Sequence, residues 1–303
     1  MEPDTGTVLV TGATGFIGKR LVRELVSEGH RVRCLVRRPD APVPVGTERA
    51  VGDLLEPATL ATALAGVDTA YYLVHSMAGG RAGFERRDRQ AAENFVAAGN
   101  RSGLRRAIYL GGLGETGDDL SEHLASRLEV ATILRSGNFK TTFLRAAVIV
   151  GAGGASFEMV KSLVERLPVM ITPRWVSTRC QPIAVGDVIR YLTGCLREER
   201  TAGETYDIGG PDILTYREMM EHFAQVEKRF TMILSVPVLT PKLSSYWVGL
   251  VTSVRPSIAM PLIEGLKNEV ICRDNRIRDL IPFELTPYDE AIKIALAEEK
   301  ESV

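Results

Sequence analysis

The segment Val8–Gly18 constrains the fold more than any other part of the chain. It reads Val-Leu-Val-Thr-Gly-Ala-Thr-Gly-Phe-Ile-Gly, with glycines at 12, 15 and 18 after an apolar run. One glycine permits the tight turn, one lets backbone approach a pyrophosphate, and one lets the following helix pack close to the strand. That helix, predicted over 16–28, points its free N–H groups and positive dipole end at the anion. The motif therefore predicts a dinucleotide site.

The alternation of strand and helix patterns continues beyond this unit. Strands are predicted over 8–10, 31–36, 50–52, 69–74, 106–110 and 141–150, and helices over 16–28, 57–65, 83–102 and 121–135. Six strands joined by crossover helices are typical of a doubly wound parallel sheet. The predicted fold class is thus α/β, a Rossmann doubly wound parallel sheet with a smaller C-terminal substrate lobe.

The regular alternation ends near Gly151, where glycines and prolines become frequent. A helix over 184–196 and a strand over 204–208 are expected to return to the main sheet. A Thr-x-x-Glu capping box at Thr215 and Glu218 starts another helix, over 215–225. We therefore expect an NAD(P)-binding domain from 1–151 plus 184–209. The substrate or partner lobe is expected from 152–183 plus 210–303.

Composition excludes several classes of protein. The chain has 303 residues with 37 basic and 38 acidic side chains, so it carries no electrostatic footprint for nucleic acid. Its four cysteines show no metal-binding or disulfide spacing. The polar N-terminus runs straight into the first strand without a secretion signal. A cytoplasmic location follows as the default expectation.

One apolar segment, 232–262, invites comparison with a membrane helix. Prolines at 237, 241, 256 and 261, with Lys242 and Arg255, interrupt it. A spanning helix needs about 20 consecutive apolar residues, so no membrane span is predicted. We favour a packed hydrophobic lobe, and peripheral membrane contact is the alternative.

The residues after the second predicted strand distinguish between dinucleotides. An acidic side chain there would bind the ribose hydroxyls of NAD, but this chain has Arg37 and Arg38. Guanidinium groups match the oxygens of a 2'-phosphate, so NADP is the predicted cofactor and NAD the alternative. Asp53, just past the third strand, is expected to accept from the adenine amino group, with Leu54 flanking the ring.

These motifs resemble the short-chain dehydrogenase/reductase superfamily, especially its extended and atypical members. The matching landmarks are the glycine motif, Gly52-Asp53, Asn94, Leu144-Arg145, Pro182-Ile183 with Asp187, Tyr206 to Gly210 and Leu214 to Glu218. The runs 72–77 and 173–175 are similar to an NmrA-like bacterial branch. The candidate cofactor-binding residues are Gly12, Thr14, Gly15, Phe16, Ile17, Gly18, Arg37, Arg38, Asp53, Leu54, Val74, His75 and Arg127.

The resemblance also implies a serine after the fifth strand and a Tyr-x-x-x-Lys on the next helix, and this chain has neither. His123 and Arg127 share that spacing and one helix face, so they are candidates for proton transfer and ribose binding. His75, after the fourth strand, is a third catalytic candidate, although it could equally bond backbone. The alternative for all three is a role without chemistry.

Two classes of function fit these features. The first is an NADP-dependent oxidoreductase, or an epimerase-like enzyme, acting on an unknown small molecule. The second is a catalytically weak NADP(H) sensor, or an accessory protein that binds a protein partner, as the Rossmann-type subunit of respiratory complex I does. The sequence leaves the oligomeric state undetermined.

Overall fold

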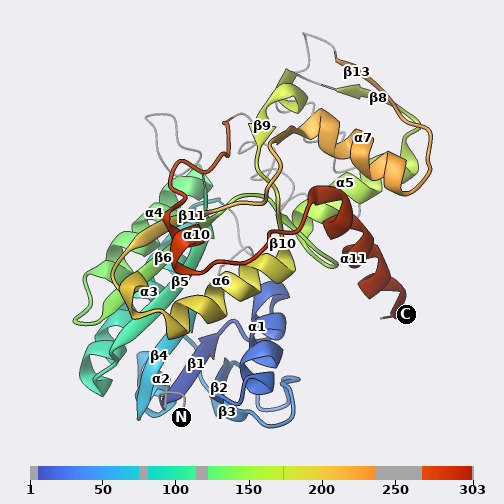
Figure 1. Ribbon diagram of the computed structural model, residues 1–303. Helices are drawn as coiled ribbons and strands as arrows, with labels where there is room; N and C mark the ends of the chain where they lie inside the picture. The colour runs from blue at the N-terminus through green and yellow to red at the C-terminus, as the bar shows by residue number, and fades with distance from the viewer. Residues whose placement is uncertain (1–5, 75–80, 114–121, 173, 236–267, 302–303) are drawn as a thin grey trace.

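A seven-stranded parallel sheet forms the centre of the computed structural model, which describes residues 6–74, 81–113, 122–172, 174–235 and 268–301 (Figure 1). The strand order is β11-β6-β5-β4-β1-β2-β3, so the order reverses between β1 and β4. The strands are β1 (Thr7–Thr11), β2 (Arg31–Val36), β3 (Glu48–Val51), β4 (Val67–Tyr72), β5 (Arg106–Gly112), β6 (Lys140–Ala146) and β11 (Thr205–Ile208). The predicted Rossmann fold is confirmed.

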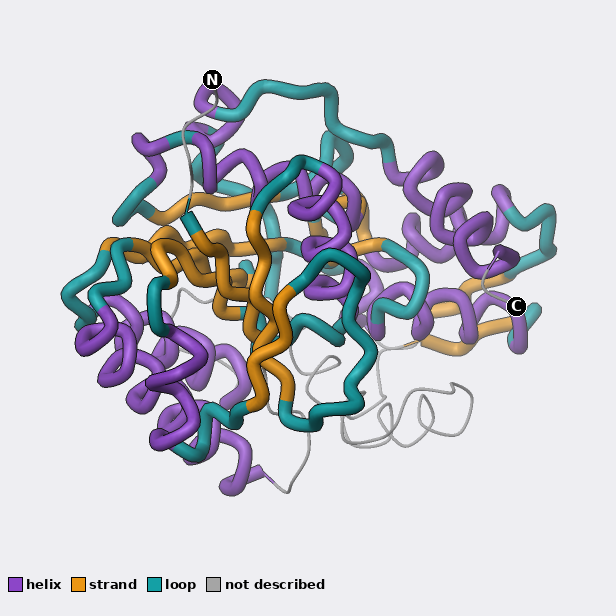
Figure 2. Tube along the Cα trace, turned by 90° about the horizontal axis from the view of Figure 1, so that it is seen from below, coloured by secondary structure: helices purple, strands orange, loops and turns teal. Residues whose placement is uncertain are grey.

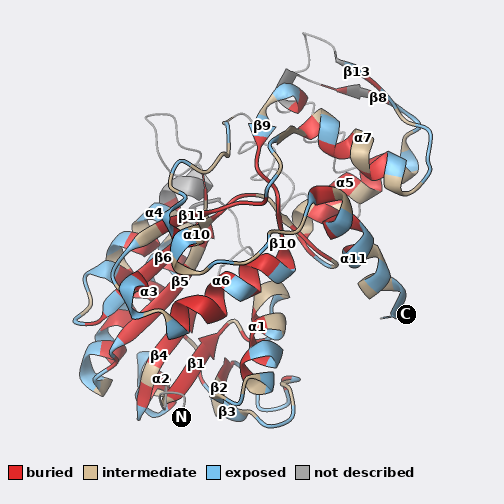
Figure 3. Cartoon of the chain, viewed as in Figure 1, coloured by how far each residue is buried: buried red, intermediate tan, exposed pale blue. Residues whose placement is uncertain are grey.

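Helices cover both faces of this sheet (Figure 2). They are α1 (Phe16–Ser27), α2 (Pro57–Leu64), α3 (Arg81–Ser102), α4 (Glu122–Arg135) and α6 (Val185–Arg197). Central strands are buried on both faces because helices cover each side, which explains their nearly continuous apolar sequences (Figure 3). Tyr71 and Tyr72 of β4 are fully buried.

The single sixth strand predicted over 141–150 is wrong. β6 ends at Ala146, and a separate strand, β7 (Ile149–Val150), pairs with β10 (Ile183–Ala184) outside the main sheet. The chain turns away at Val148, whose carbonyl accepts from the Ile183 N–H at 2.9 Å. This long-range pairing draws residues 148–150 toward the second lobe.

The second lobe has its own apolar core, which includes Phe157, Met219 and Phe223. Its remaining elements are α5 (Ala155–Arg166), β8 (Val169–Thr172), η1 (Arg174–Ser177), β9 (Arg179–Cys180), β12 (Leu214–Thr215), α7 (Tyr216–Val226), β13 (Met232–Ser235) and α11 (Tyr288–Glu301). The predicted capping box of α7 is present in both directions, between Thr215 and Glu218.

The stretch 276–285 packs away from this lobe and against the Rossmann layer. Ile277 of α10 (Arg276–Leu280) lies in the same core cluster as α6, with Phe283 and Leu285 partly buried beside it. A short helix, η2 (Glu199–Thr201), completes the set of elements in the described residues. The predicted domain boundaries assign residues 210–303 to the second lobe. The stretch 276–285 nevertheless makes its apolar contacts with the Rossmann layer.

Neither a membrane helix nor a metal cluster is found in the part of the chain that the structure describes. No helix there is long and apolar enough to cross a bilayer. Most of the apolar segment discussed above, from residue 236 onward, lies outside the described residues. No described cluster of His, Cys, Asp or Glu is arranged to hold a metal ion.

Candidate dinucleotide site

The glycine turn lies at the carboxyl end of β1, where the strand order reverses. Gly12 has φ of 67°, a left-handed conformation that favours glycine, and its carbonyl accepts from the Gly15 N–H at 2.9 Å. A Cβ on Gly18 would lie 2.1 Å from the Gly12 carbonyl oxygen. Helix and turn can therefore approach this closely only because residue 18 is a glycine.

The start of α1 leaves backbone donors without a side-chain cap. Gly15 is the N-cap residue and provides no capping hydrogen bond, and Thr14 beside it is exposed. The first turn of a helix has N–H groups without intrahelical acceptors, which an anion can accept. Phe16 and Ile17, the next two candidates, are partly buried. This geometry fits the pyrophosphate of a dinucleotide.

The candidates for the adenosine end follow β2 and β3 at the same edge of the sheet. Arg37 and Arg38 are exposed, and Arg38 makes a loose ion pair with Asp40 at 3.6 Å. The Asp53 carboxylate accepts from the Leu55 N–H at 2.9 Å, while Leu54 is buried. β1 pairs with β2 and β2 pairs with β3 in parallel, so these residues lie along the same edge of the sheet as the glycine turn.

Asn94 of α3 anchors the loop that follows β3. Its amide nitrogen donates to the Leu54 carbonyl at 2.8 Å, and its side chain is buried. The sequence analysis named Asn94 as a family landmark without giving it a role. Its spacing of 40 residues from Leu54 explains why a local pattern could not reveal the contact.

The candidates for the nicotinamide end follow β4 and β5. Val74 is partly buried just after β4, whereas His75 lies outside the described residues. β5 ends in glycine, and the Leu113 N–H donates to the Ala146 carbonyl at 2.7 Å. His123 and Arg127 both belong to α4, four residues apart, but the side chain of His123 is not described.

The side chain of Arg127 is partly buried on α4. Its Nε is buried and has no hydrogen-bond partner among the residues that the structure describes. Its backbone carbonyl accepts a long bond of 3.5 Å from the Tyr109 hydroxyl of β5. A buried N–H without an acceptor is costly, so Arg127 is a candidate for binding an oxygen atom of a ligand.

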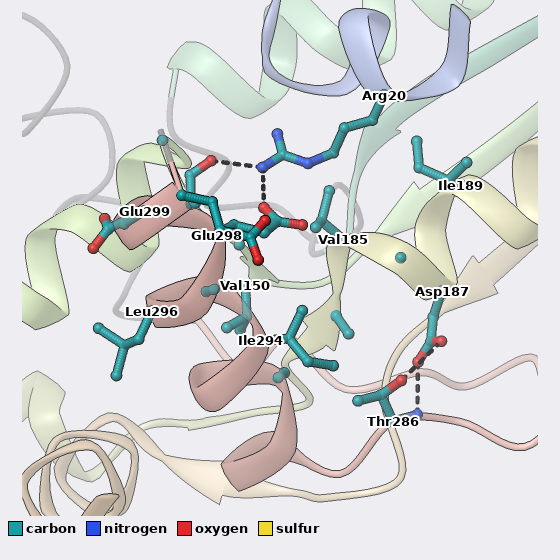
Figure 4. Close-up of a pocket in the computed structure, with 18 of the residues that line it drawn as sticks. Arg20, Val150, Val185, Asp187, Ile189, Thr286, Ile294, Leu296, Glu298 and Glu299 are labelled. Atoms are coloured by element: carbon teal, nitrogen blue, oxygen red, sulfur yellow. Dashed lines mark hydrogen bonds and ion pairs between the residues drawn. The ribbon is translucent and has the colours of Figure 1, made fainter. Parts of the chain in front are cut away.

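A groove of about 1260 Å³ lies elsewhere, between α1, α6 and α11 (Figure 4). It is lined by Lys19 and Arg20 of α1, Val185 and Ile189 of α6, and Glu298 of α11. None of the glycines at 12, 15 and 18 lines it. The groove is therefore distinct from the predicted dinucleotide site, and the sequence analysis did not anticipate it.

Two buried carboxylates, on α6 and β11, hold neighbouring segments in place through hydrogen bonds. Asp187 of α6 accepts from the Thr286 N–H at 2.7 Å, and Asp207 of β11 accepts from Arg145 at 2.7 Å. Both carboxylates are about 1% exposed. Their positions match family landmarks, and the structure gives both a structural role.

Comparisons with known proteins agree with this geometry. A family model described as NAD(P)H-binding matches residues 12–161. A 3-beta-hydroxysteroid dehydrogenase of Mycolicibacterium neoaurum is 36% identical over 120 residues, which are 36% of this chain and 32% of that protein. The match thus spans about a third of the relative's length.

Two longer matches extend over most of the chain. A mitochondrial NADH dehydrogenase [ubiquinone] 1 alpha subcomplex subunit 9 of Arabidopsis thaliana is 23% identical over 301 residues, covering 92% of this chain and 75% of that protein. The structure of triphenylmethane reductase from Citrobacter sp. superposes with a TM-score of 0.78 at 20% identity, covering 96% and 99% of the two chains.

The family match begins at the glycine turn, and the structural match includes the second lobe. The sheet order, the conformation of the glycine turn, the family model and the structural match all agree with one another. Residues 12–161 match the NAD(P)H-binding family, and the chain as a whole shares its fold with triphenylmethane reductase.

Proposed function

We propose that this protein is an NADP-dependent oxidoreductase that acts on a small organic molecule. The observation that carries the proposal is the buried Nε of Arg127 on α4, after β5, which has no partner in the described part of the chain. A protein that only needed a rigid helix there would gain stability from an apolar residue. An arginine kept without an internal acceptor is instead suited to a bound ribose hydroxyl or a substrate oxygen.

The residues of the chain divide the work as follows. The first turn of α1 binds the pyrophosphate, Arg37 and Arg38 bind the 2'-phosphate, and Arg127 orients the nicotinamide ribose. His123, one turn before Arg127, is the proposed proton donor to the substrate, with His75 as the alternative. The bound nicotinamide supplies hydride-transfer chemistry.

Substitution of Arg127 by methionine tests the proposal. We expect the Kd for NADPH to rise about 10-fold or more, because a hydrogen bond to a charged group contributes about 1.5–3 kcal/mol. Turnover with carbonyl or enone substrates should fall further. Fluorescence titration with NADPH measures the first effect, and Arg135→Met at the end of the same helix is the control. Equal affinities for the Arg127 variant and wild type would refute the role of this residue.

The preference for NADP has its own test. Arg37→Ala and Arg38→Ala should each weaken NADPH binding by about 10-fold while leaving NADH binding nearly unchanged, because a neutral ribose offers the guanidinium little. Paired titrations with both nucleotides measure the ratio of their Kd values. Equal losses for NADPH and NADH would remove the argument for a 2'-phosphate.

An accessory role is the second candidate, and one observation favours it. The β8–β13 pair has an exposed apolar face, with Val169 48%, Met232 44% and Leu234 49% exposed and Phe230 nearby at 68%. Such a face is suited to a protein partner or a membrane surface. The Arabidopsis relative is named as a subunit of a larger complex. NADPH binding without turnover on any carbonyl or enone substrate would favour this role over the first.

A further inference from the structure

Arg20 joins three segments that are far apart in the chain. It lies on α1, one turn after Phe16, and its guanidinium donates to the Phe16 carbonyl at 3.1 Å and the Ala152 carbonyl at 2.9 Å. The same group forms an ion pair with Glu298 of α11 at 2.5 Å. Figure 4 shows Arg20 reaching from α1 toward Glu298, with both bonds to the distant segments drawn.

Arg20 is also packed against the nucleotide end of its helix. Its guanidinium carbon lies 4.8 Å from the centroid of the Phe16 ring, and its side chain is only 15% exposed. The Phe16 ring in turn abuts Gly154, where a Cβ would lie 2.9 Å from the ring. The first residue of α1 therefore touches the turn that begins the second lobe, both directly and through Arg20.

The partners of Arg20 belong to the second lobe. Ala152 precedes α5, and α11 contributes Tyr288, Ile292 and Ala295 to the apolar core of that lobe. A separate ion pair between Lys161 of α5 and Glu299 ties α11 to the second lobe without involving α1. Arg20 thus links α1 directly to two parts of the second lobe, the turn before α5 and helix α11.

We propose that Arg20 is a positioning residue that couples dinucleotide binding at the glycine turn to the docking of α11 and the 151–154 turn on α1. The inference rests on the proposed nucleotide site. Bound pyrophosphate would order the first turn of α1 and thereby the Phe16 carbonyl and ring that hold the guanidinium. A guanidinium already held in place loses less conformational entropy when it binds Ala152 and Glu298, so each event favours the other.

Hydrogen exchange measured by mass spectrometry, with and without NADPH, tests the coupling. In the wild-type chain, NADPH should slow exchange in 16–20 and also in 288–301, the latter by about five-fold. Arg20→Met keeps an aliphatic side chain at this position and loses the guanidinium donors. It should retain the effect in 16–20 and lose the effect in 288–301. The matched control, Lys161→Met, removes a different α11 ion pair, the one with Glu299, and should respond as wild type does.

Three results would contradict the proposal, and they are distinguishable. No response of 16–20 in wild type would count against the nucleotide site and, with it, the coupling. A response of 16–20 with none in 288–301 would leave the nucleotide site standing and refute the coupling. If NADPH slowed exchange in 288–301 of Arg20→Met as much as in wild type, the coupling through Arg20 would likewise be refuted. Without nucleotide, faster exchange of 288–301 in Arg20→Met than in wild type is the expected supporting result.

Discussion

Replacing Gly18 with alanine is expected to weaken NADPH binding by about 100-fold or more, which corresponds to at least about 2.7 kcal/mol. The added Cβ would lie 2.1 Å from the Gly12 carbonyl oxygen and 2.8 Å from its carbon, distances that atoms cannot keep. Either the helix moves away from the strand or the turn changes shape. Both movements displace the first-turn N–H groups that the pyrophosphate needs.

A matched control separates this local effect from a general loss of stability. Gly186, in the first turn of α6, has no atom within 4 Å of an added Cβ apart from its chain neighbours and its own helix backbone, and it is not in the left-handed region. Gly186→Ala should bind NADPH as wild type does and gain up to about 1 kcal/mol from helix propensity. Isothermal titration measures the affinities, and thermal unfolding confirms that each variant is folded. Wild-type affinity in Gly18→Ala would overturn the assigned role of the glycine turn.

The sequence predicted the nucleotide end of the fold well because that information is local. A strand, its turn and the next helix lie within residues 7–27, and their apolar spacing and glycines are adjacent in the chain. Arg37 and Arg38 could be placed for the same reason, since they directly follow a recognisable strand. Parallel pairing then brings these ends together without further information.

The break between β6 and β7 could not be predicted in this way. Residues 141–150 contain a nearly continuous β-prone run, and only the bond from Ile183 to Val148 shows where the chain leaves the sheet. The Arg20 ion pair with Glu298 spans 278 positions, and no local period encodes such a contact. Likewise, only the folded structure shows that the Nε of Arg127 is buried without an acceptor among the described residues.

Asp207 shows how much stability these long-range contacts carry. Its carboxylate is 1% exposed, accepts from Arg145 at 2.7 and 2.5 Å, and also accepts from the Arg273 and Asp274 N–H groups at 2.9 and 3.2 Å. Asp207→Ala would leave a partly buried guanidinium and two backbone donors without that acceptor. We expect a loss of about 3–5 kcal/mol in the free energy of unfolding, as for other broken buried ion pairs.

Urea unfolding of Asp207→Ala against a surface control tests this expectation. Glu290→Gln breaks a pair with Lys293 whose side chains are 53% and 59% exposed, and it should cost less than about 0.5 kcal/mol. Asp207→Asn should fall between the two, because an amide oxygen still accepts but carries no charge. If Asp207→Ala cost no more than Glu290→Gln, the carboxylate could not be what fastens residues 273–274 to β11. If the large loss is found, it follows that the carboxyl ends of β6 and β11 depend on a charge that no local sequence pattern distinguishes from a surface aspartate.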